Sequence, residues 1–146
     1  MGHKCHIVKY ERGGIAAVGS AFPWIVRNNP DGTLPLEQIE YVCSITPNEL
    51  VVPVAGITLE SSQNHMSGKV LRPDYISKVK KLAKKYTATL HLDGARSWNA
   101  AVFLGMDMKE MTKDFDVVSV CLSKGMGCPI GSLVVGSAKT IHEVRN

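Results

Sequence analysis

Four short apolar runs, separated by segments with helical spacing, constrain the fold of this chain more than any other feature. The runs have the length of strands and cover residues 54–60, 87–92, 116–122 and 130–135. Residues 73–86 carry apolar side chains at three- and four-residue steps, and residues 97–104 form a short apolar helix that Gly105 closes. Strands that alternate with helices predict an α/β fold with a mainly parallel sheet and flanking helices.

The first third of the chain is less regular. Residues 15–19 read as the end of a short apolar helix, and residues 28–33 are rich in turn formers. Helical periodicity follows over residues 34–43, with Thr33 as the candidate N-cap. These elements fit one domain with one core, because 146 residues is an ordinary domain length.

Two ionisable residues stand at predicted strand ends. Asp93 directly follows the second run, and Lys124 comes just after the third. In open α/β sheets, functional groups collect at the carboxyl ends of the strands. The two positions therefore mark a candidate site, and His91, two residues before Asp93, shares its strand face as a supporting residue.

The chemistry of these residues suggests pyridoxal phosphate. Lysine amines form Schiff bases with the aldehyde of this cofactor, and glycines at 125, 127 and 131 let a ligand approach the backbone. A carboxylate such as Asp93 keeps the pyridine nitrogen protonated. Arg96 has a planar fork that suits a substrate carboxylate or a cofactor oxygen.

Plainer interpretations stay open at this point. A lysine after a strand is commonly a solvated surface residue, and Asp-Gly is commonly a turn. Asp93 and Arg96 also fit an ordinary loop ion pair, which contributes about 0–1 kcal/mol when it is exposed.

Composition and charge argue against nucleic-acid binding, a membrane span and secretion. The net charge is +4, and the lysines of residues 78–85 have the spacing of a solvated helix face without interleaved aromatic residues, so we expect no nucleic-acid partner. No run is long enough to cross a membrane. The four cysteines, which lack C-x-x-C spacing, and the absence of a secretory pattern favour free thiols in the cytoplasm.

Five segments together resemble the low-specificity threonine aldolases, within the aromatic amino-acid β-eliminating lyase and threonine aldolase superfamily. They keep the family's order and span nearly the whole chain. The segments are CHIVKYERGG at 5–14, PDGTLPL at 30–36, GKVLRP at 68–73, HLDGARSWNA at 91–100 and SVCLSKGMGCPIGS at 119–132.

The resemblance implies the aminotransferase-like fold of pyridoxal-phosphate enzymes and a role for four residues. Lys124 is expected to bind pyridoxal 5'-phosphate covalently, and Asp93 to face its pyridine nitrogen. Arg96 is expected to bind the carboxylate of the amino-acid substrate. His6 matches the histidine that stacks on the cofactor ring.

The implied reaction is the cleavage of L-threonine or L-allo-threonine to glycine and an aldehyde, by an enzyme that forms a homo-oligomer. Family members are more than twice as long, so residues 1–146 are expected to be part of the large cofactor-binding domain, without its N-terminal part and without the small C-terminal domain. The chain departs from the family pattern at Gln63, where the family has a histidine near the substrate hydroxyl. Two alternatives are a truncated, non-catalytic relative and a related β-eliminating lyase.

Overall fold

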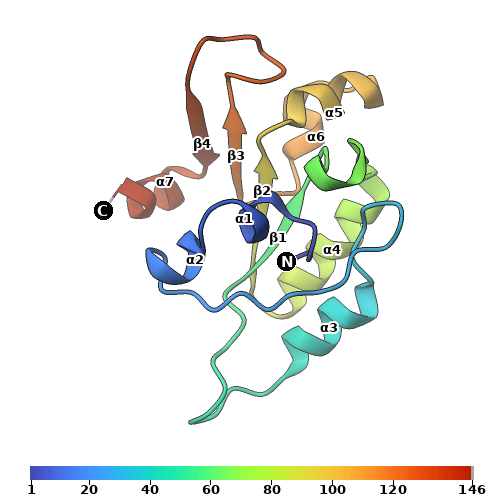
Figure 1. The fold of residues 1–146 in the computed structure, drawn as a ribbon. Helices are drawn as coiled ribbons and strands as arrows, with labels where there is room; N and C mark the ends of the chain where they lie inside the picture. Colours follow the sequence, from blue (N-terminus) through green and yellow to red (C-terminus); the bar gives the residue numbers. More distant parts are fainter. Residues whose placement is uncertain (146) are drawn as a thin grey trace.

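The structure is a computed structural model that describes residues 1–145, and its centre is a four-stranded sheet in the order β1-β2-β3-β4 (Figure 1). β1 (Gly56–Glu60), β2 (Thr89–Gly94) and β3 (Val117–Cys121) are parallel neighbours, and β4 (Ser132–Gly136) pairs with β3 in the antiparallel direction. The predicted α/β fold with a mainly parallel sheet is confirmed.

The two faces of the parallel strands differ in chemistry. Side chains alternate along a strand, and residues in register on parallel neighbours point to the same side. One face is apolar, and its buried members include Leu59, Leu90, Leu92, Val118 and Val120. The other face is mainly polar: it carries Val117 together with Thr58, Glu60, His91, Asp93, Ser119 and Cys121.

Three helices pack on the apolar face. α4 (Pro73–Lys85) contributes Ile76, Val79 and Ala83 to a core with β1 and β2. α5 (Ser97–Leu104) and α6 (Met108–Thr112) cover β3 and the end of β2 through Ala100, Ala101 and Met111. Burial of these side chains stabilises the fold and fixes which face of the sheet remains for polar groups.

The other helices lie around this unit. α1 (His6–Lys9) and α2 (Gly14–Ala17) belong to the N-terminal segment, α3 (Leu36–Ser44) packs beside α4, and α7 (Ala138–Arg145) follows β4. A single 3-10 turn, η1 (Asn64–Met66), lies shortly after β1. The sequence did not predict α1, α6 or α7; α1 and α6 have only four and five residues, which give little periodicity.

The start of β2 and the direction of β4 differ from the sequence prediction for identifiable reasons. β2 begins at Thr89 rather than at residue 87, because Thr87 adopts a left-handed conformation (φ 55°) that closes the end of α4. β4 is antiparallel to β3, because the ten residues from 122 to 131 are too few for a helical crossover.

The expectation that Thr33 caps the first long helix is wrong. The N-cap position of α3 is Pro35, and no side chain accepts a hydrogen bond there. The Thr33 backbone N–H and hydroxyl instead donate to Asp31 at 3.0 and 2.7 Å. Thr33 therefore closes a local turn that precedes the helix.

The lysine-rich helix is a solvated face, as its spacing predicts. Lys78, Lys81, Lys84 and Lys85 are exposed on α4. Three of the helix lysines pair with carboxylates, namely Lys78 with Asp74, Lys80 with Asp116 and Lys85 with Glu40. Within residues 1–145, no helix combines the length and the apolar character needed to cross a bilayer.

We expect Leu92→Ala to lower the free energy of unfolding by about 2–5 kcal/mol, because Leu92 is fully buried between the sheet and α5. Val102→Ala is the matched control, since Val102 is 83% exposed and its truncation should change stability by less than about 0.5 kcal/mol. Urea unfolding of both variants measures the difference. Equal losses in the two variants would contradict this description of the core.

Candidate active site

The candidate site lies at the carboxyl ends of β1, β2 and β3, on the polar face of the sheet. Glu60 is in register with Asp93, and Asp93 is in register with Ser119. Cys121, two residues beyond Ser119, ends β3 on the same face. The parallel register therefore places two carboxylates, a hydroxyl and a thiol at one edge.

Asp93 is buried at the end of β2, with 7% of its surface exposed. Its Oδ1 accepts a hydrogen bond from the Ala95 backbone N–H at 3.2 Å, which fixes the carboxylate as the chain turns toward α5. The following residue, Gly94, has no room for a side chain, because a Cβ there would lie 2.8 Å from the Ser119 carbonyl oxygen. Asp93 thus sits in a tightly packed strand end.

Glu60 is the functional candidate that sequence reasoning missed. It is 2% exposed, and its two carboxylate oxygens each accept a backbone hydrogen bond at 2.8 Å, one from His6 and one from Asn64. Burial raises the pKa of the Glu60 carboxyl, and the nearby Asp93 raises it further, while the two backbone N–H groups lower it. The sequence did carry one signal for Glu60: like Asp93, it stands at the end of a predicted strand.

His6 begins α1 and is brought to the site by its backbone contact with Glu60. The ring is held on both nitrogens. Nδ1 lies 3.1 Å from the Asn64 side-chain amide, and Nε2 lies 3.2 Å from a carboxylate oxygen of Glu11. The Tyr10 ring lies 4.8 Å from the His6 ring, so the imidazole is fixed in place on the polar side of β1.

Lys124 is exposed in the loop between β3 and β4. Its Nζ donates to the Cys121 sulfur at 2.8 Å, and within residues 1–145 no ion pair or hydrogen bond joins it to Asp93. α5 supports this loop, since the Trp98 indole N–H donates to the Cys121 carbonyl at 3.2 Å. A Cβ at Gly125 would also collide with the Asn99 side chain, so the loop packs closely on α5.

Arg96 is half-buried at the N-cap position of α5, directly after the β2 strand end. Its guanidinium lowers the pKa of the Glu60 carboxyl, which places the two side chains in the same electrostatic environment. The next residue, Ser97, donates from its hydroxyl to the Ser61 carbonyl at 2.9 Å. The start of α5 is thereby fixed to the segment that follows β1.

Gln63 and His65 lie on that segment. Gln63 is buried, and its side-chain oxygen has no hydrogen-bond partner among the described residues. His65 stacks on Tyr10 with ring centres 5.0 Å apart, so Tyr10 lies between the His65 and His6 rings. His91 contacts Ser119 at 3.4 Å, and burial lowers the pKa of its imidazole, which favours the neutral form.

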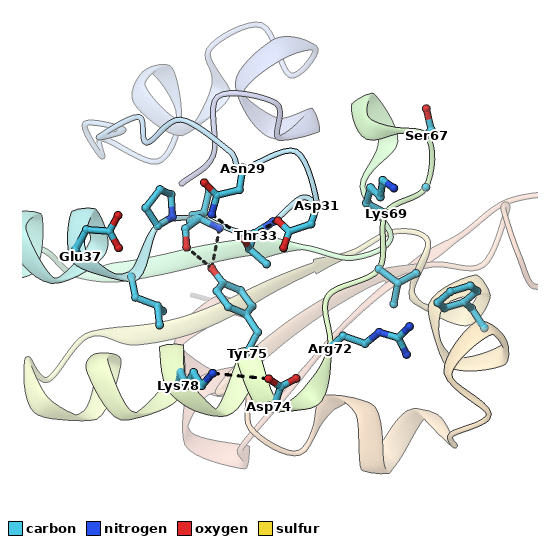
Figure 2. Close-up of a pocket in the computed structure, with 16 residues that line it drawn as sticks. Asn29, Asp31, Thr33, Glu37, Ser67, Lys69, Arg72, Asp74, Tyr75 and Lys78 are labelled. Atoms are coloured by element: carbon cyan, nitrogen blue, oxygen red, sulfur yellow. Dashed lines mark hydrogen bonds and ion pairs between the residues drawn. The ribbon is translucent and has the colours of Figure 1, made fainter.

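A hollow of about 810 Å³ lies elsewhere and holds none of the predicted site residues (Figure 2). Several of its polar groups are already paired: the Tyr75 hydroxyl accepts from the Leu34 N–H at 2.8 Å and donates to the Leu34 carbonyl at 3.0 Å, and Lys78 pairs with Asp74. Burial raises the pKa of Tyr75 to about 12, so its hydroxyl stays protonated. We therefore place the candidate site at the strand ends and not in this hollow.

Comparison with known proteins gives the family. The model of the protein family described as "Beta-eliminating lyase" matches residues 1–146. The chain belongs to the β-eliminating lyase family. Among curated proteins, the chain is 43% identical over 146 residues to "Probable low-specificity L-threonine aldolase 2" of Arabidopsis thaliana, covering 99% of the chain and 41% of the relative. It is 38% identical over 137 residues to "Low specificity L-threonine aldolase" of Escherichia coli K12, covering 94% of the chain and 40% of the relative.

Solved structures of similar proteins share the fold. A putative L-allo-threonine aldolase from Listeria monocytogenes superposes with a TM-score of 0.80 at 24% identity, over 96% of this chain and 36% of its own. A threonine aldolase from Leishmania major gives a TM-score of 0.74 at 22% identity, over 97% of this chain and 42% of its own. This chain spans about two fifths of the length of the curated relatives that it matches.

We expect the stability difference between wild type and Glu60→Gln to depend on pH. Because the folded pKa of Glu60 is raised, its protonated form favours folding; this contribution is fully present below the unfolded pKa near 4.5 and is lost as the pH rises through the folded pKa. The wild type should therefore lose stability relative to the variant as the pH rises above about 4.5. Urea unfolding at several pH values measures this, and a pH-independent difference would contradict the burial of Glu60.

Proposed function

We propose that the chain supplies the cofactor lysine and neighbouring site residues of a pyridoxal 5'-phosphate-dependent lyase. The proposed reaction cleaves L-threonine or L-allo-threonine to glycine and an aldehyde. One observation carries the proposal: the exposed Lys124 amine follows β3 at the polar sheet edge that also holds the buried Asp93 carboxylate. The names of the curated relatives support the substrate class.

The residues present fit this cofactor. When bound, pyridoxal phosphate supplies an electron sink for the electron pair left at the substrate Cα. Lys124 contacts the Cys121 thiol rather than a carboxylate, so its exposed amine is accessible to an aldehyde. Asp93, buried and fixed by the Ala95 N–H, favours a protonated pyridine nitrogen beside it.

Arg96 and His6 complete the proposed set. Arg96 is a half-buried guanidinium next to Asp93 in the chain, and we assign it to the substrate carboxylate and to the cofactor-binding side of the site. We assign His6 to stacking on the cofactor ring and to the proton of the substrate β-hydroxyl, because its imidazole is fixed at both nitrogens beside the strand ends.

Gln63 supports a second candidate, a relative that binds the cofactor without turnover. A buried amide neither takes up nor releases a proton near neutral pH, so Gln63 cannot act as a general base. Loss of such a base lowers a rate by roughly 10²–10⁴. A related β-eliminating lyase would use the same Lys124 and Asp93.

Three broader proposals rest on the resemblance. Residues 1–146 form part of a large cofactor-binding domain, whose remaining N-terminal part and small C-terminal domain belong to a longer protein. A homo-oligomer is supported by the apolar side chains that β4 exposes, including Leu133, Val134 and Val135. Four free cysteines support a reducing compartment such as the cytoplasm.

We expect pyridoxal phosphate and borohydride to leave a reduced adduct on Lys124 of the purified chain, because its amine is exposed and next to the Asp93 strand end. Peptide mass mapping locates the adduct. Lys124→Ala should abolish it, and Lys81→Ala is the matched control, since Lys81 is an exposed lysine on α4 away from the site.

The Lys124 adduct and glycine release together distinguish an aldolase from a non-catalytic relative. An adduct on Lys124 together with glycine release from threonine supports the aldolase. The same adduct without release supports the non-catalytic relative. Adducts spread over the surface lysines, with no preference for Lys124, would overturn the cofactor assignment.

A further inference from the structure

Glu60 joins two segments that lie far apart in the sequence. Its Oε2 accepts the backbone N–H of His6, 54 positions away, and its Oε1 accepts the backbone N–H of Asn64, each at 2.8 Å. Both bonds involve an almost fully buried carboxylate, which is 2% exposed. Hydrogen bonds to a charged acceptor are stronger than hydrogen bonds between neutral groups. The Glu60 carboxylate therefore fixes both segments to the end of β1.

The same residue controls the His6 ring at two points. It holds the His6 backbone directly, and it holds the backbone of Asn64, whose side-chain amide lies 3.1 Å from the His6 Nδ1 atom. Removing the Glu60 acceptors would release both anchors together. Glu11, the partner of the other ring nitrogen, is 57% exposed and is a weaker restraint by itself.

Glu60 also fixes the position of His6 relative to Asp93. Glu60 and Asp93 are Cα partners in the parallel pairing of β1 with β2, and both side chains lie on the polar face. Within residues 1–145, no ion pair compensates the Glu60 charge. An apolar side chain would fill the same space without this unfavourable burial of charge, so a need for two aligned acceptors explains the carboxylate.

We propose that Glu60 is a positioning residue that sets the placement of the His6 imidazole against the Asp93 carboxylate. This inference rests on the proposed function, in which His6 stacks on the cofactor ring and Asp93 faces the pyridine nitrogen. Glu60 itself acts through the His6 and Asn64 backbones.

The first arm of the test needs no cofactor. Amide hydrogen exchange is measured on the 146-residue chain, on Glu60→Gln and on Ser61→Ala. Ser61 is the matched control, because it is equally buried and its hydroxyl accepts one backbone hydrogen bond, from Leu71. Glutamine keeps one acceptor oxygen and replaces the other with an amide donor, so in Glu60→Gln we expect exchange at one of the two amides, His6 or Asn64, to be at least about tenfold faster. In Ser61→Ala, the faster exchange should appear at Leu71 and not at His6.

The second arm reads the orientation of the bound cofactor. Glu60→Gln should still form the borohydride-trapped adduct on Lys124, but the circular dichroism band of the bound cofactor should lose most of its intensity, because the His6 ring is no longer fixed. Ser61→Ala should keep the band. A role for Glu60 in folding alone would leave this band unchanged in a folded variant.

Unchanged His6 and Asn64 exchange in folded Glu60→Gln, or an unchanged dichroism band, would overturn the proposal. If Glu60→Gln does not fold, Glu60→Asp replaces it: the shorter carboxylate cannot reach both N–H groups, so one of the two amides must lose protection, and protection of both would overturn the proposal. If the wild-type chain forms no adduct on Lys124, the proposed function fails, while the exchange arm still decides whether Glu60 positions His6.

Discussion

The parallel register of β1, β2 and β3 is the constraint on which the rest of the structure depends. It makes one face of the three strands apolar, and α4, α5 and α6 bury that face. The same register leaves Glu60, Asp93 and Cys121 on the opposite face near the strand ends. A shift of one residue in either pairing would exchange the faces and place carboxylates in the core. The packing of the core and the location of the candidate site therefore have one cause.

The N-terminal segment reaches this edge through polar contacts. Cys5 is buried, with its thiol pKa raised to about 11 by burial, and the adjacent His6 is bonded to Glu60. The start of α5 is likewise tied to the segment after β1 through Ser97 and Ser61. Three stretches that are distant in the sequence thus meet around the ends of β1 and β2, and an imidazole, a guanidinium and two carboxylates share one small region.

Long periodic segments were predictable from the sequence, because their patterns are local. The strands β1 to β3 were predicted from short apolar runs, and α4 was predicted from apolar residues at three- and four-residue steps. Asp93 and Lys124 were identified from their place after strands. Glu60 was not identified, because its role depends on hydrogen bonds from the His6 and Asn64 N–H groups, which only the folded chain brings close to it. The antiparallel direction of β4 and the turn at Thr33 likewise depend on loop length and on a competing hydrogen bond.

β4 is a strand whose apolar side chains no other part of the described chain covers. All five of its residues are exposed, although three of them are large and apolar. An exposed apolar strand of this kind offers a surface for pairing or packing with another segment or another chain.

The most direct test of the account is a crystal structure of the chain with pyridoxal phosphate bound. The account predicts electron density continuous with the Lys124 amine, a ring nitrogen within hydrogen-bond distance of Asp93, and His6 on the ring. A cofactor in the hollow around Tyr75, or attached to a lysine of α4, would contradict the assignment of the active site to the strand ends.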